Sequence, residues 1–510
     1  MPYIGNSPAE KYASFAVQHF TTSATTGYTL DHAVANENDI RLVINNVIQQ
    51  PGSGKAYVAS GTTLTLSAAT SGTDTMYCVF LGKAVQTVVP PESSITGAML
   101  SDTVISGQSA LGAEPADTDE FLVSDAGVLK RVDYSYIKSS VVNRPNAQPI
   151  FINGDMAVAQ RGTSATGKTT SDIYTCDRMG LVTDSIGTYT VAQEAQTSGN
   201  AFANGFANAW RLDCTTADAS PGASDQLEMQ YTFEGQDLQV FKKGTANAEK
   251  YTLAFWVKSN KTGTGNIQLK DKDNSNRQCT QSYTISVANT WEHKVCVFGA
   301  DTTGAMDDDN AKSLIINWWL GSGTDYSSGT ANHGVWEAQD NTKVNAGGTL
   351  NINDNTANDW SITGIQLEVG EYTSSTLPPF QHESYGDNLQ RCRRYCNLHM
   401  NTDQNGGPFL NQCFAYTSSN WNSSVNLTPP MRAVPTVTSV SGTNYYVIFS
   451  NGGTINYNQI DFNDATLSGG VCNVVDLHLD GASGGTAGHA GKTRGNSTGA
   501  GTMLLMDAEL

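Results

Sequence analysis

The amino-acid sequence predicts an all-β protein of serial antiparallel β-sandwich or jelly-roll-like domains, with one short amphipathic helix before the C-terminal β-domain. Two observations predict it. Apolar residues alternate with polar ones, and Gly, Asn or Pro interrupts the alternation about every eight to twelve residues. Charged residues make up only 15% of the chain, and 49 residues are Gly. This composition suits strands joined by tight turns and disfavours long solvated helices.

The N-terminal part divides into two predicted regions. Residues 1–90 alternate in three runs, two of them at 40–44 and 76–80, and predict a β-domain that ends at Pro90-Pro91. Residues 91–145 are rich in Gly, Ser and Asp and predict a stem or linker. Its one ordered feature is a short hairpin with a turn at Asp125-Ala126-Gly127.

Residues 146–380 carry the clearest strands and predict a large jelly-roll-like sandwich. In the pair Trp318-Trp319, one ring must face the core and the other the opposite side of the sheet. The outward ring could stack on a sugar, or a loop or a neighbouring chain could cover it. Residues 401–510 predict a last β-domain, here called the tip, in which alternate residues of 445–449 are apolar.

Residues 381–400 predict a helical connector. Ser384 and Asp387 have the spacing of a capping box, and one face of the helix carries Leu389, Cys392 and Cys396. Three copies of the chain could bury this stripe around an axis, so we expect it to hold a homotrimer.

The composition excludes several classes of protein. A net charge of −19 argues against nucleic-acid binding, because such binding depends on Lys and Arg neutralising phosphates. The strongest apolar run, at 314–320, is far shorter than the about 20 residues of a membrane span, so no membrane insertion is expected. The first residues lack the pattern of a secretory signal. The nine cysteines have neither disulfide-framework nor zinc-site spacing, and we expect free thiols, no metal and no cofactor.

Two motifs could carry catalysis. Residues 162–169 satisfy the P-loop expression GxxxxGK[ST], with Lys168 and Thr169 as phosphate and magnesium ligands. The following residues lack helical periodicity, which favours a loop between strands. Residues 481–485 match the GxSxG nucleophile elbow around Ser483, but a glycine-rich run follows where that elbow needs a helix. We therefore predict a protein that is not an enzyme, with no catalytic residues.

An acidic segment could bind calcium. Residues 271–276 resemble the start of a calcium-binding loop, but they lack its glycine at position six and its glutamate at position twelve. Solvated turns are the favoured interpretation of this segment and of the acidic residues 307–309.

Several segments resemble bacteriophage tail fibre proteins of the short-tailed phage type. They are FINGDMAVAQRGT at 151–163, YTCDR at 174–178, YTLAFWVKS at 251–259, ITGIQLEVG at 362–370, SYGDNLQRCRRY at 384–395, PMRAVPT at 430–436 and DAEL at 507–510. The resemblance covers about residues 120–510 and is looser before them. It implies a homotrimeric virion protein, made in the host cytoplasm, whose first domain attaches to the tail or portal-adaptor proteins and whose last domain faces the host. The sequence departs from that pattern in lacking a long coiled-coil or repeat shaft.

The predicted function is host adsorption through the tip, by binding a surface glycan or an outer-membrane protein. The predicted site is a glycine-rich loop at 481–501, with eight glycines in 21 residues, which should keep its backbone exposed and out of regular strands. Its donors and a nearby ring are His489, Lys492, Arg494, Asn496 and Trp421. Two alternatives stay open: a depolymerase tailspike that cleaves capsule or lipopolysaccharide, and a purely structural tail adaptor.

Overall fold

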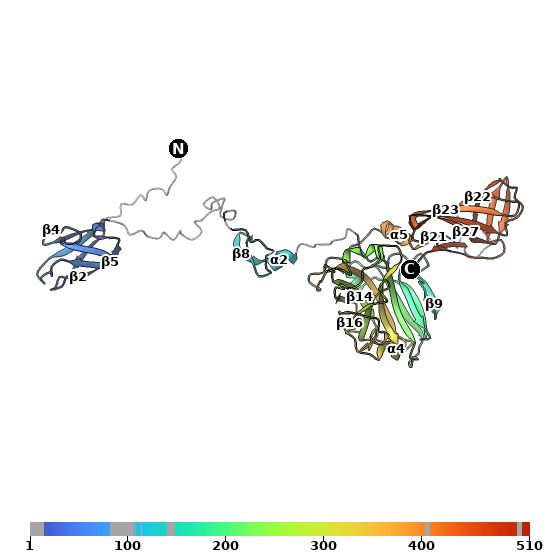
Figure 1. The fold of residues 1–510 in the computed structure, drawn as a ribbon, viewed down its shortest axis with the longest axis horizontal. Coiled ribbons are helices and arrows are strands. Elements are labelled where there is room, and N and C mark those ends of the chain that lie inside the picture. Colours follow the sequence, from blue (N-terminus) through green and yellow to red (C-terminus); the bar gives the residue numbers. More distant parts are fainter. Residues whose placement is uncertain are drawn as a thin grey trace. The chain divides into compact units, whose positions relative to one another are not determined.

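The computed structural model describes residues 15–81, 107, 109–113, 115–139, 148–402, 409–496 and 502–510. The chain forms two compact units, Met1–Pro115 and Ala116–Leu510 (Figure 1). The predicted all-β fold class is confirmed: multiple antiparallel sheets dominate the structure. The predicted domain boundaries stay predictions, and the boundary at Pro90-Pro91 lies outside the described residues.

The first unit contains two small sheets around one core. The four-stranded sheet has the order β1-β6-β3-β4, and the other pairs β2 with β5. Leu42, Leu64 and Cys78 are fully buried between them. The elements are β1 Val17–Phe20, β2 Gly27–Val34, η1 Glu37–Asp39, β3 Ile40–Ile44, β4 Val47–Ile48, β5 Tyr57–Leu66 and β6 Met76–Phe80.

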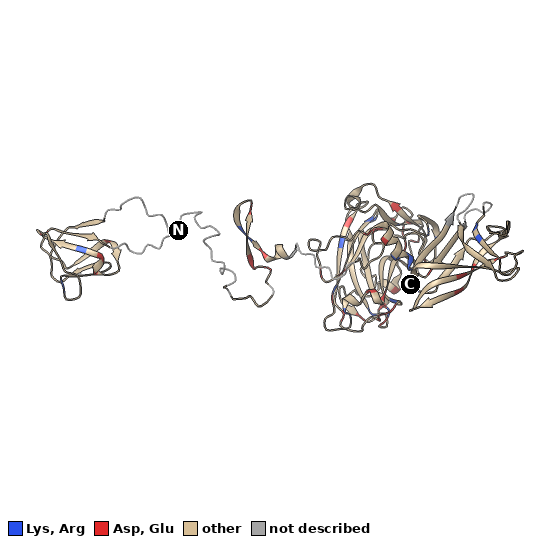
Figure 2. Ribbon diagram, turned by 90° about the horizontal axis from the view of Figure 1, so that it is seen from above, with Lys and Arg blue, Asp and Glu red and all other residues tan. Residues whose placement is uncertain are grey.

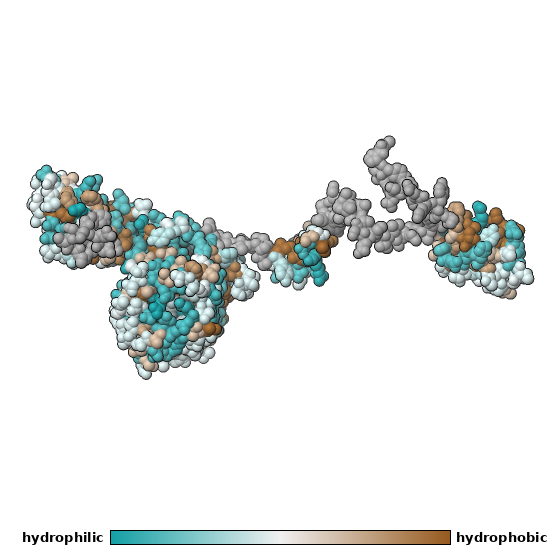
Figure 3. Space-filling model, turned by 180° about the vertical axis from the view of Figure 1, so that it is seen from behind, coloured by the Kyte–Doolittle hydropathy of each residue, from teal (hydrophilic) through white to brown (hydrophobic). Residues whose placement is uncertain are grey.

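The second unit begins with an isolated hairpin, formed by β7 (Glu120–Asp125) and β8 (Val128–Asp133) and followed by α2 (Tyr134–Ser139). The hairpin lacks a core of its own, because every described side chain of β7 is exposed. Leu122 and Leu129 lie on one face of it and are 75% and 70% exposed. The brown surface of this hairpin is visible in Figure 3.

Two six-stranded sheets pack face to face as the large sandwich, with strand orders β10-β13-β18-β15-β16-β19 and β17-β14-β20-β12-β11-β9. Trp210, Trp318 and Trp360 lie fully buried between them. The strands are β9 Ser164–Lys168, β10 Gly180–Asp184, β11 Thr188–Ala195, β12 Asn208–Thr216, β13 Gln226–Glu234, β14 Tyr251–Ser259, β15 Gly263–Asp271, β16 Gln278–Ile285, β17 Glu292–Phe298, β18 Lys312–Ser322, β19 Trp336–Glu337 and β20 Asp359–Val369. The short helices are α3 Gly199–Ala203, η3 Gly235–Asp237, η4 Gln239–Phe241, α4 Thr324–Ser327 and η5 Asn341–Lys343.

The outer face of the first of these sheets is covered. Trp319 points outward, as predicted for one of the two tryptophans, but Tyr326 lies against its ring at 5.0 Å and it is 2% exposed. Amide side chains bond across four neighbouring strands beside it, from Gln230 through Asn317 and Gln268 to Gln278, at 3.0–3.1 Å. These bonds satisfy polar groups that loops have removed from water.

Helix α5 (Tyr385–Arg393) is shorter than the predicted helix, because the chain enters strand β21 at Cys396. The predicted cap is confirmed: the Ser384 hydroxyl oxygen accepts a hydrogen bond from the Asp387 backbone N–H at 3.2 Å. The helix joins the sandwich to the tip, since the Arg394 guanidinium donates to both carboxylate oxygens of Glu234 on β13 at 2.7–2.8 Å.

The tip places a three-stranded sheet, β21-β30-β24, against a seven-stranded sheet, β26-β25-β29-β22-β23-β28-β27. Their shared core contains Met506, Trp421 and Leu477. The strands are β21 Cys396–Thr402, β22 Phe409–Ala415, β23 Trp421–Met431, β24 Thr436–Ser439, β25 Tyr446–Ser450, β26 Gly453–Tyr457, β27 Gln459–Ser468, β28 Val471–Asp480, β29 Ala490–Gly495 and β30 Thr502–Asp507.

The nine cysteines are all free and all buried, and they are distributed over every cored part of the chain. Free thiols were predicted from their spacing. Within the described ranges, the structure has no helix with the length and apolar character of a membrane span.

Candidate functional site

The outer face of the seven-stranded tip sheet collects two cations and three aromatic rings. Lys492 and Arg494 alternate with buried Thr493 along β29, so both side chains point away from the core. Strand β29 pairs with β22 on one side and β25 on the other. These neighbours contribute Phe409, Phe414 and Phe449, all exposed. We call these five residues the tip face.

The cations of the tip face lie over its rings. The Lys492 ammonium is 5.4 Å from the centre of the Phe409 ring, and the Arg494 guanidinium carbon is 4.5 Å from that of Phe449. Neither side chain forms an ion pair within the described part of the chain, and Nε of Arg494 is buried without a hydrogen-bond partner. Figure 2 shows how sparse charged residues are on the strands around them. In a chain of net charge −19, two adjacent unpaired cations favour an anionic ligand.

The backbone conformation at this site differs from the irregular loop that the sequence predicted. Residues 490–495 form a strand inside the sheet, although the glycine density predicted an irregular loop. Gly491 fits because a Cβ there would meet Ile448 at 2.6 Å and the Cys413 sulfur at 3.1 Å, so only hydrogen allows this close packing. The Tyr457 hydroxyl bonds Thr493, and burial raises the pKa of that tyrosine. Residues 497–501 of the predicted loop lie outside the described residues.

The other predicted site residues are not among the five that make up the tip face. Trp421 is fully buried, because the turn after β28 brings Gly485 against its ring, where a Cβ would come within 2.7 Å. Trp421 therefore cannot stack on a sugar, which corrects that part of the prediction. Asn496 lies just past β29 and donates to Asn456 at 3.4 Å. His489 precedes the strand and accepts a backbone bond from Ala415.

The predicted trimer stripe is also covered. Cys392 and Cys396 are fully buried. Cys392 and partly buried Leu389 pack against Ile152 and Val158 of the same chain. The stripe was expected to be exposed on one copy, and this expectation is wrong, because the start of the sandwich already occupies it. These residues therefore belong to the junction between sandwich and tip.

None of the catalytic or calcium motifs builds its expected site. Residues 164–168 of the P-loop match form the edge strand β9, and Lys168 lies over the Tyr174 ring at 4.5 Å. Ser483 is exposed in the turn after β28, with no helix behind it. Asp271 is not a solvated turn residue: it is fully buried and pairs with the Lys243 ammonium at 2.5 Å.

One cluster that could bind a metal was missed in the sequence. Asp461 on β27 faces His478 on β28, Asp480 follows two residues later, and one ligand atom from each lies within 4.8 Å of the others. Asp461 is distant in sequence from His478 and Asp480, and these two are separated by one residue. The cluster therefore becomes apparent only from the pairing of β27 with β28. Asp461 accepts a hydrogen bond from Gln459 at 2.9 Å, and a metal would have to compete with it.

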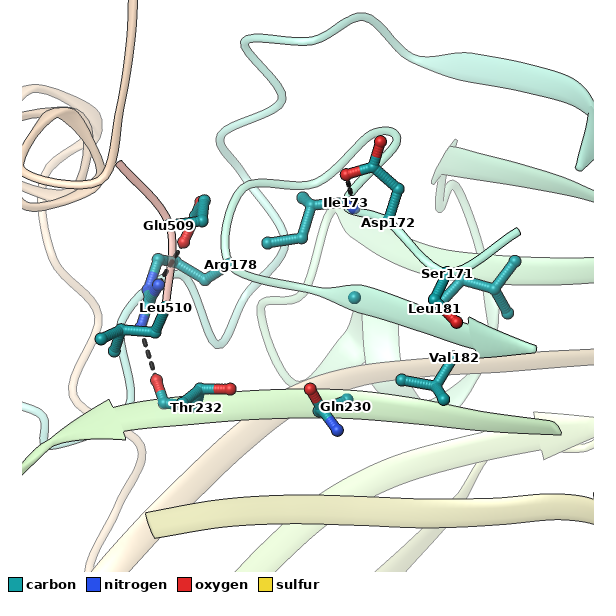
Figure 4. A pocket seen from close by; sticks show the side chains of 11 residues that line it. Ser171, Asp172, Ile173, Arg178, Leu181, Val182, Gln230, Thr232, Glu509 and Leu510 are labelled. Carbon is teal, nitrogen blue, oxygen red and sulfur yellow. Dashed lines mark hydrogen bonds and ion pairs between the residues drawn. The ribbon is translucent and has the colours of Figure 1, made fainter. Parts of the chain in front are cut away.

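A pocket of about 220 Å³ lies where the C-terminal residues meet the sandwich. Figure 4 shows Arg178 at one end of it, bonded to Glu509 and to the Thr232 carbonyl. The Asp172 carboxylate accepts from the Ile173 backbone N–H. The charged side chains that line this pocket, Asp172, Arg178 and Glu509, therefore each have a hydrogen-bond partner. Arg178 is fully buried and its guanidinium lies 3.5 Å from the Tyr395 ring centre, which makes the pocket part of a structural joint.

Comparisons with known proteins find similar structures but no matching protein family. No protein-family model and no curated protein matches the chain. One similar structure is the enzymatically active domain of tailspike protein 4 from bacteriophage CBA120, at 13% identity and a TM-score of 0.22, covering 43% of this chain and 21% of the tailspike chain.

Carbohydrate-binding modules are similar as well. The C-terminal family 22 module of Clostridium thermocellum Xyn10B matches at 12% identity and a TM-score of 0.21, covering 38% of this chain and 87% of the module. A family 61 module in complex with β-1,4-galactotriose matches at 7% identity and a TM-score of 0.20, covering 44% and 99%. At these identities and TM-scores the likeness is loose and concerns the fold alone.

The prediction that the chain is not an enzyme is contradicted, because one of these similar structures is an enzymatically active domain. That prediction rested on the P-loop and GxSxG matches, each of which lacks the helix that its site needs. Rejecting these two motifs leaves other catalytic groups untested, because a sequence does not show which carboxylates lie at a catalytic separation.

Proposed function

We propose that this chain is a bacteriophage tail fibre protein, a structural component of the virion that adsorbs the phage to its host through the tip face. The segments that resemble tail fibre proteins support this proposal, and they lie in the sandwich, the connector and the tip. The observation that carries the binding role is the pair of unpaired cations over exposed phenylalanine rings.

The chemistry of the tip face favours an anionic surface glycan. Lys492 and Arg494 supply hydrogen-bond donors and positive charge to phosphates or carboxylates, and the exposed rings supply apolar area for the carbon face of a sugar. Each contact is weak on an exposed surface, so several copies of the tip on one particle would supply avidity. Adsorption should then weaken as salt rises, because exposed charges are screened.

The test is a double substitution, Lys492→Ser with Arg494→Ser, in the full-length protein. We expect at least about a tenfold loss of binding to host cells and to purified phosphorylated lipopolysaccharide, the change that follows a loss of about 1.4 kcal/mol. The matched control is Lys272→Ser, an exposed cation on the sandwich. Equal binding by the double variant and the control would place adsorption elsewhere.

The homotrimer is proposed to form through the hairpin β7–β8, since the α5 stripe is buried. A two-stranded hairpin is at best marginally stable alone in water. This one exposes Leu122 and Leu129 on one face and Phe121, Val123 and Val128 on the other. Further copies of the same chain would cover these side chains and add the strands that a stable sheet requires.

Light scattering tests this assembly. The full-length chain should give three times its mass of 54.3 kDa, and Leu122→Ser with Leu129→Ser should give monomers. Tyr385→Ser, at an exposed position of α5, is the control and should remain trimeric. A trimer that survives the hairpin substitutions would move the interface to another surface.

Residues 1–90 are proposed to attach the fibre to the tail or portal-adaptor proteins, as the resemblance implies. A chain that lacks them should still bind host cells but should be absent from purified particles. Normal incorporation of the shortened chain would assign the attachment to a later part of the sequence.

A further inference from the structure

We propose a second, separate binding site: the cleft of the sandwich beside Trp256, which takes a neutral saccharide. The cleft has a volume of about 370 Å³, inside the range of about 300–1,000 Å³ that is common for small-molecule sites. It lies on the outer face of the sheet that contains β14 and β20, away from the tip face.

The sheet and a crossing segment build the walls. Trp256 on β14 and His293 on β17 are cross-strand partners, with rings 5.0 Å apart. The segment 370–382 crosses the same face and is held there by a hydrogen bond from the Gln366 amide to the Pro378 carbonyl at 3.0 Å. A second bond joins the Thr252 hydroxyl to the Gly370 carbonyl at 2.7 Å.

The far end of the cleft is rigid. Phe206, Phe380 and His382 pack ring against ring, with centres 4.8–5.4 Å apart. Gly364 has a φ of +60°, and a Cβ there would come within 2.7 Å of the Phe206 ring. The glycine therefore lets this ring lie directly on strand β20. A preformed wall reduces the ordering that a ligand must cause on binding.

The chemistry of the lining selects the ligand. It consists of aromatic rings, imidazoles, amides, a hydroxyl, prolines, a leucine and a glycine, and it contains no Lys, Arg, Asp or Glu. Burial, with a smaller contribution from Lys294, lowers the pKa of His293, which favours the uncharged form of that imidazole. A saccharide presents both an apolar carbon face for the rings and hydroxyl groups for the amides. Because the lining carries no fixed charge, it offers no ion pair to offset the free-energy cost of desolvating a phosphate or carboxylate.

The experiment uses the full-length protein and a panel of neutral glucose, galactose, mannose and xylose hexasaccharides, with a phosphorylated saccharide and a proline-rich peptide for comparison. Calorimetry should detect at least one neutral saccharide. Trp256→Ala should weaken it at least about tenfold, the change that follows a loss of about 1.4 kcal/mol. His382→Ala, at an exposed position, should also weaken it, and this variant covers the case in which Trp256→Ala unfolds.

Two controls separate this site from the tip. Phe202→Ala removes an exposed ring on α3 outside the cleft and should leave saccharide binding unchanged. The double variant of Lys492 and Arg494 should also bind the neutral saccharide normally, so failure at one site is distinguishable from failure at the other. Binding of none of the neutral saccharides, unchanged binding by Trp256→Ala and His382→Ala, or binding of the proline-rich peptide alone would overturn the assignment.

Discussion

The sandwich and the tip each have a sheet whose outer face carries polar or charged side chains, but the sandwich covers this face and the tip exposes it. On the sandwich, Asn317 and Gln268 are buried and bonded to each other. On the tip, Lys492 and Arg494 lie among exposed rings without ion-pair partners in the described residues. Strand alternation decides which side chains point outward, whereas connecting segments decide whether water or a ligand reaches them.

The largest effect is expected where the two regions meet. Arg178→Ala should lower the free energy of unfolding by about 3–5 kcal/mol, because it removes a buried guanidinium and leaves the Glu509 carboxylate with only the longer contact to Arg161, at 3.5 Å. Urea unfolding followed by tryptophan fluorescence measures this loss. Arg211→Ala, which removes partly exposed ion pairs with Asp359, Asp213 and Glu194, is the control and should cost less than about 1 kcal/mol. Similar losses for both variants would contradict a structural role of the joint.

The covered face predicts a pH effect. Burial raises the pKa of Glu228 to about 8, against a smaller opposing influence of Lys270. The folded chain therefore holds a proton that the unfolded chain releases above its ordinary pKa of 4.5, so this group lowers stability as pH rises from about 4.5 to 8. Glu228→Gln should remove that slope and raise stability at pH 7 by on the order of 3 kcal/mol. Unfolding curves at pH 5, 7 and 8.5 test both statements, and parallel curves for wild type and variant would contradict them.

A smaller effect tests the packing beneath the tip face. Gly491→Ala should cost about 1–3 kcal/mol, because its methyl group meets Ile448 and Cys413. Gly453→Ala is the matched strand control: its Cβ would make an ordinary 3.7 Å contact, and it should change stability by less than about 0.5 kcal/mol. Thermal unfolding compares them. An unchanged melting temperature in Gly491→Ala would argue against this strand register.

The smallest effect concerns the tip face itself. Lys492→Ser with Arg494→Ser should leave unfolding within about 0.5 kcal/mol of wild type, because both groups lie on the outer face without ion-pair partners. Thermal unfolding beside the adsorption assay measures it. A large loss of stability would mean that these cations hold the sheet together.

Alternation and local capping were predictable from the sequence, because both depend on neighbours within a few residues. The inward and outward rings of Trp318 and Trp319 and the Ser384 cap are examples. Strand β29 was not predictable from its glycines, since the reason for Gly491 is a contact with Ile448 and Cys413, which are distant in sequence. The burial of Cys392 against Ile152 was not predictable either, because these two residues are also distant in sequence.

Some residues of the proposed binding surfaces were predictable from the sequence and others were not. Lys492 and Arg494 stood out as cations in an acidic chain, whereas their rings and the cleft at Trp256 needed strand pairing to appear. Trp421 shows the opposite error: an aromatic residue near a glycine-rich turn is as easily covered by that turn as exposed by it.

The buried free cysteines can report the local unfolding of each region through their reactivity toward a thiol reagent. Cys78 lies in the first unit, Cys176, Cys214, Cys279 and Cys296 in the sandwich, Cys392 and Cys396 at the joint, and Cys413 and Cys472 in the tip. A thiol reagent reaches each one only when its surroundings open. Pulse labelling followed by peptide mass spectrometry would therefore time the opening of each region without any engineered probe.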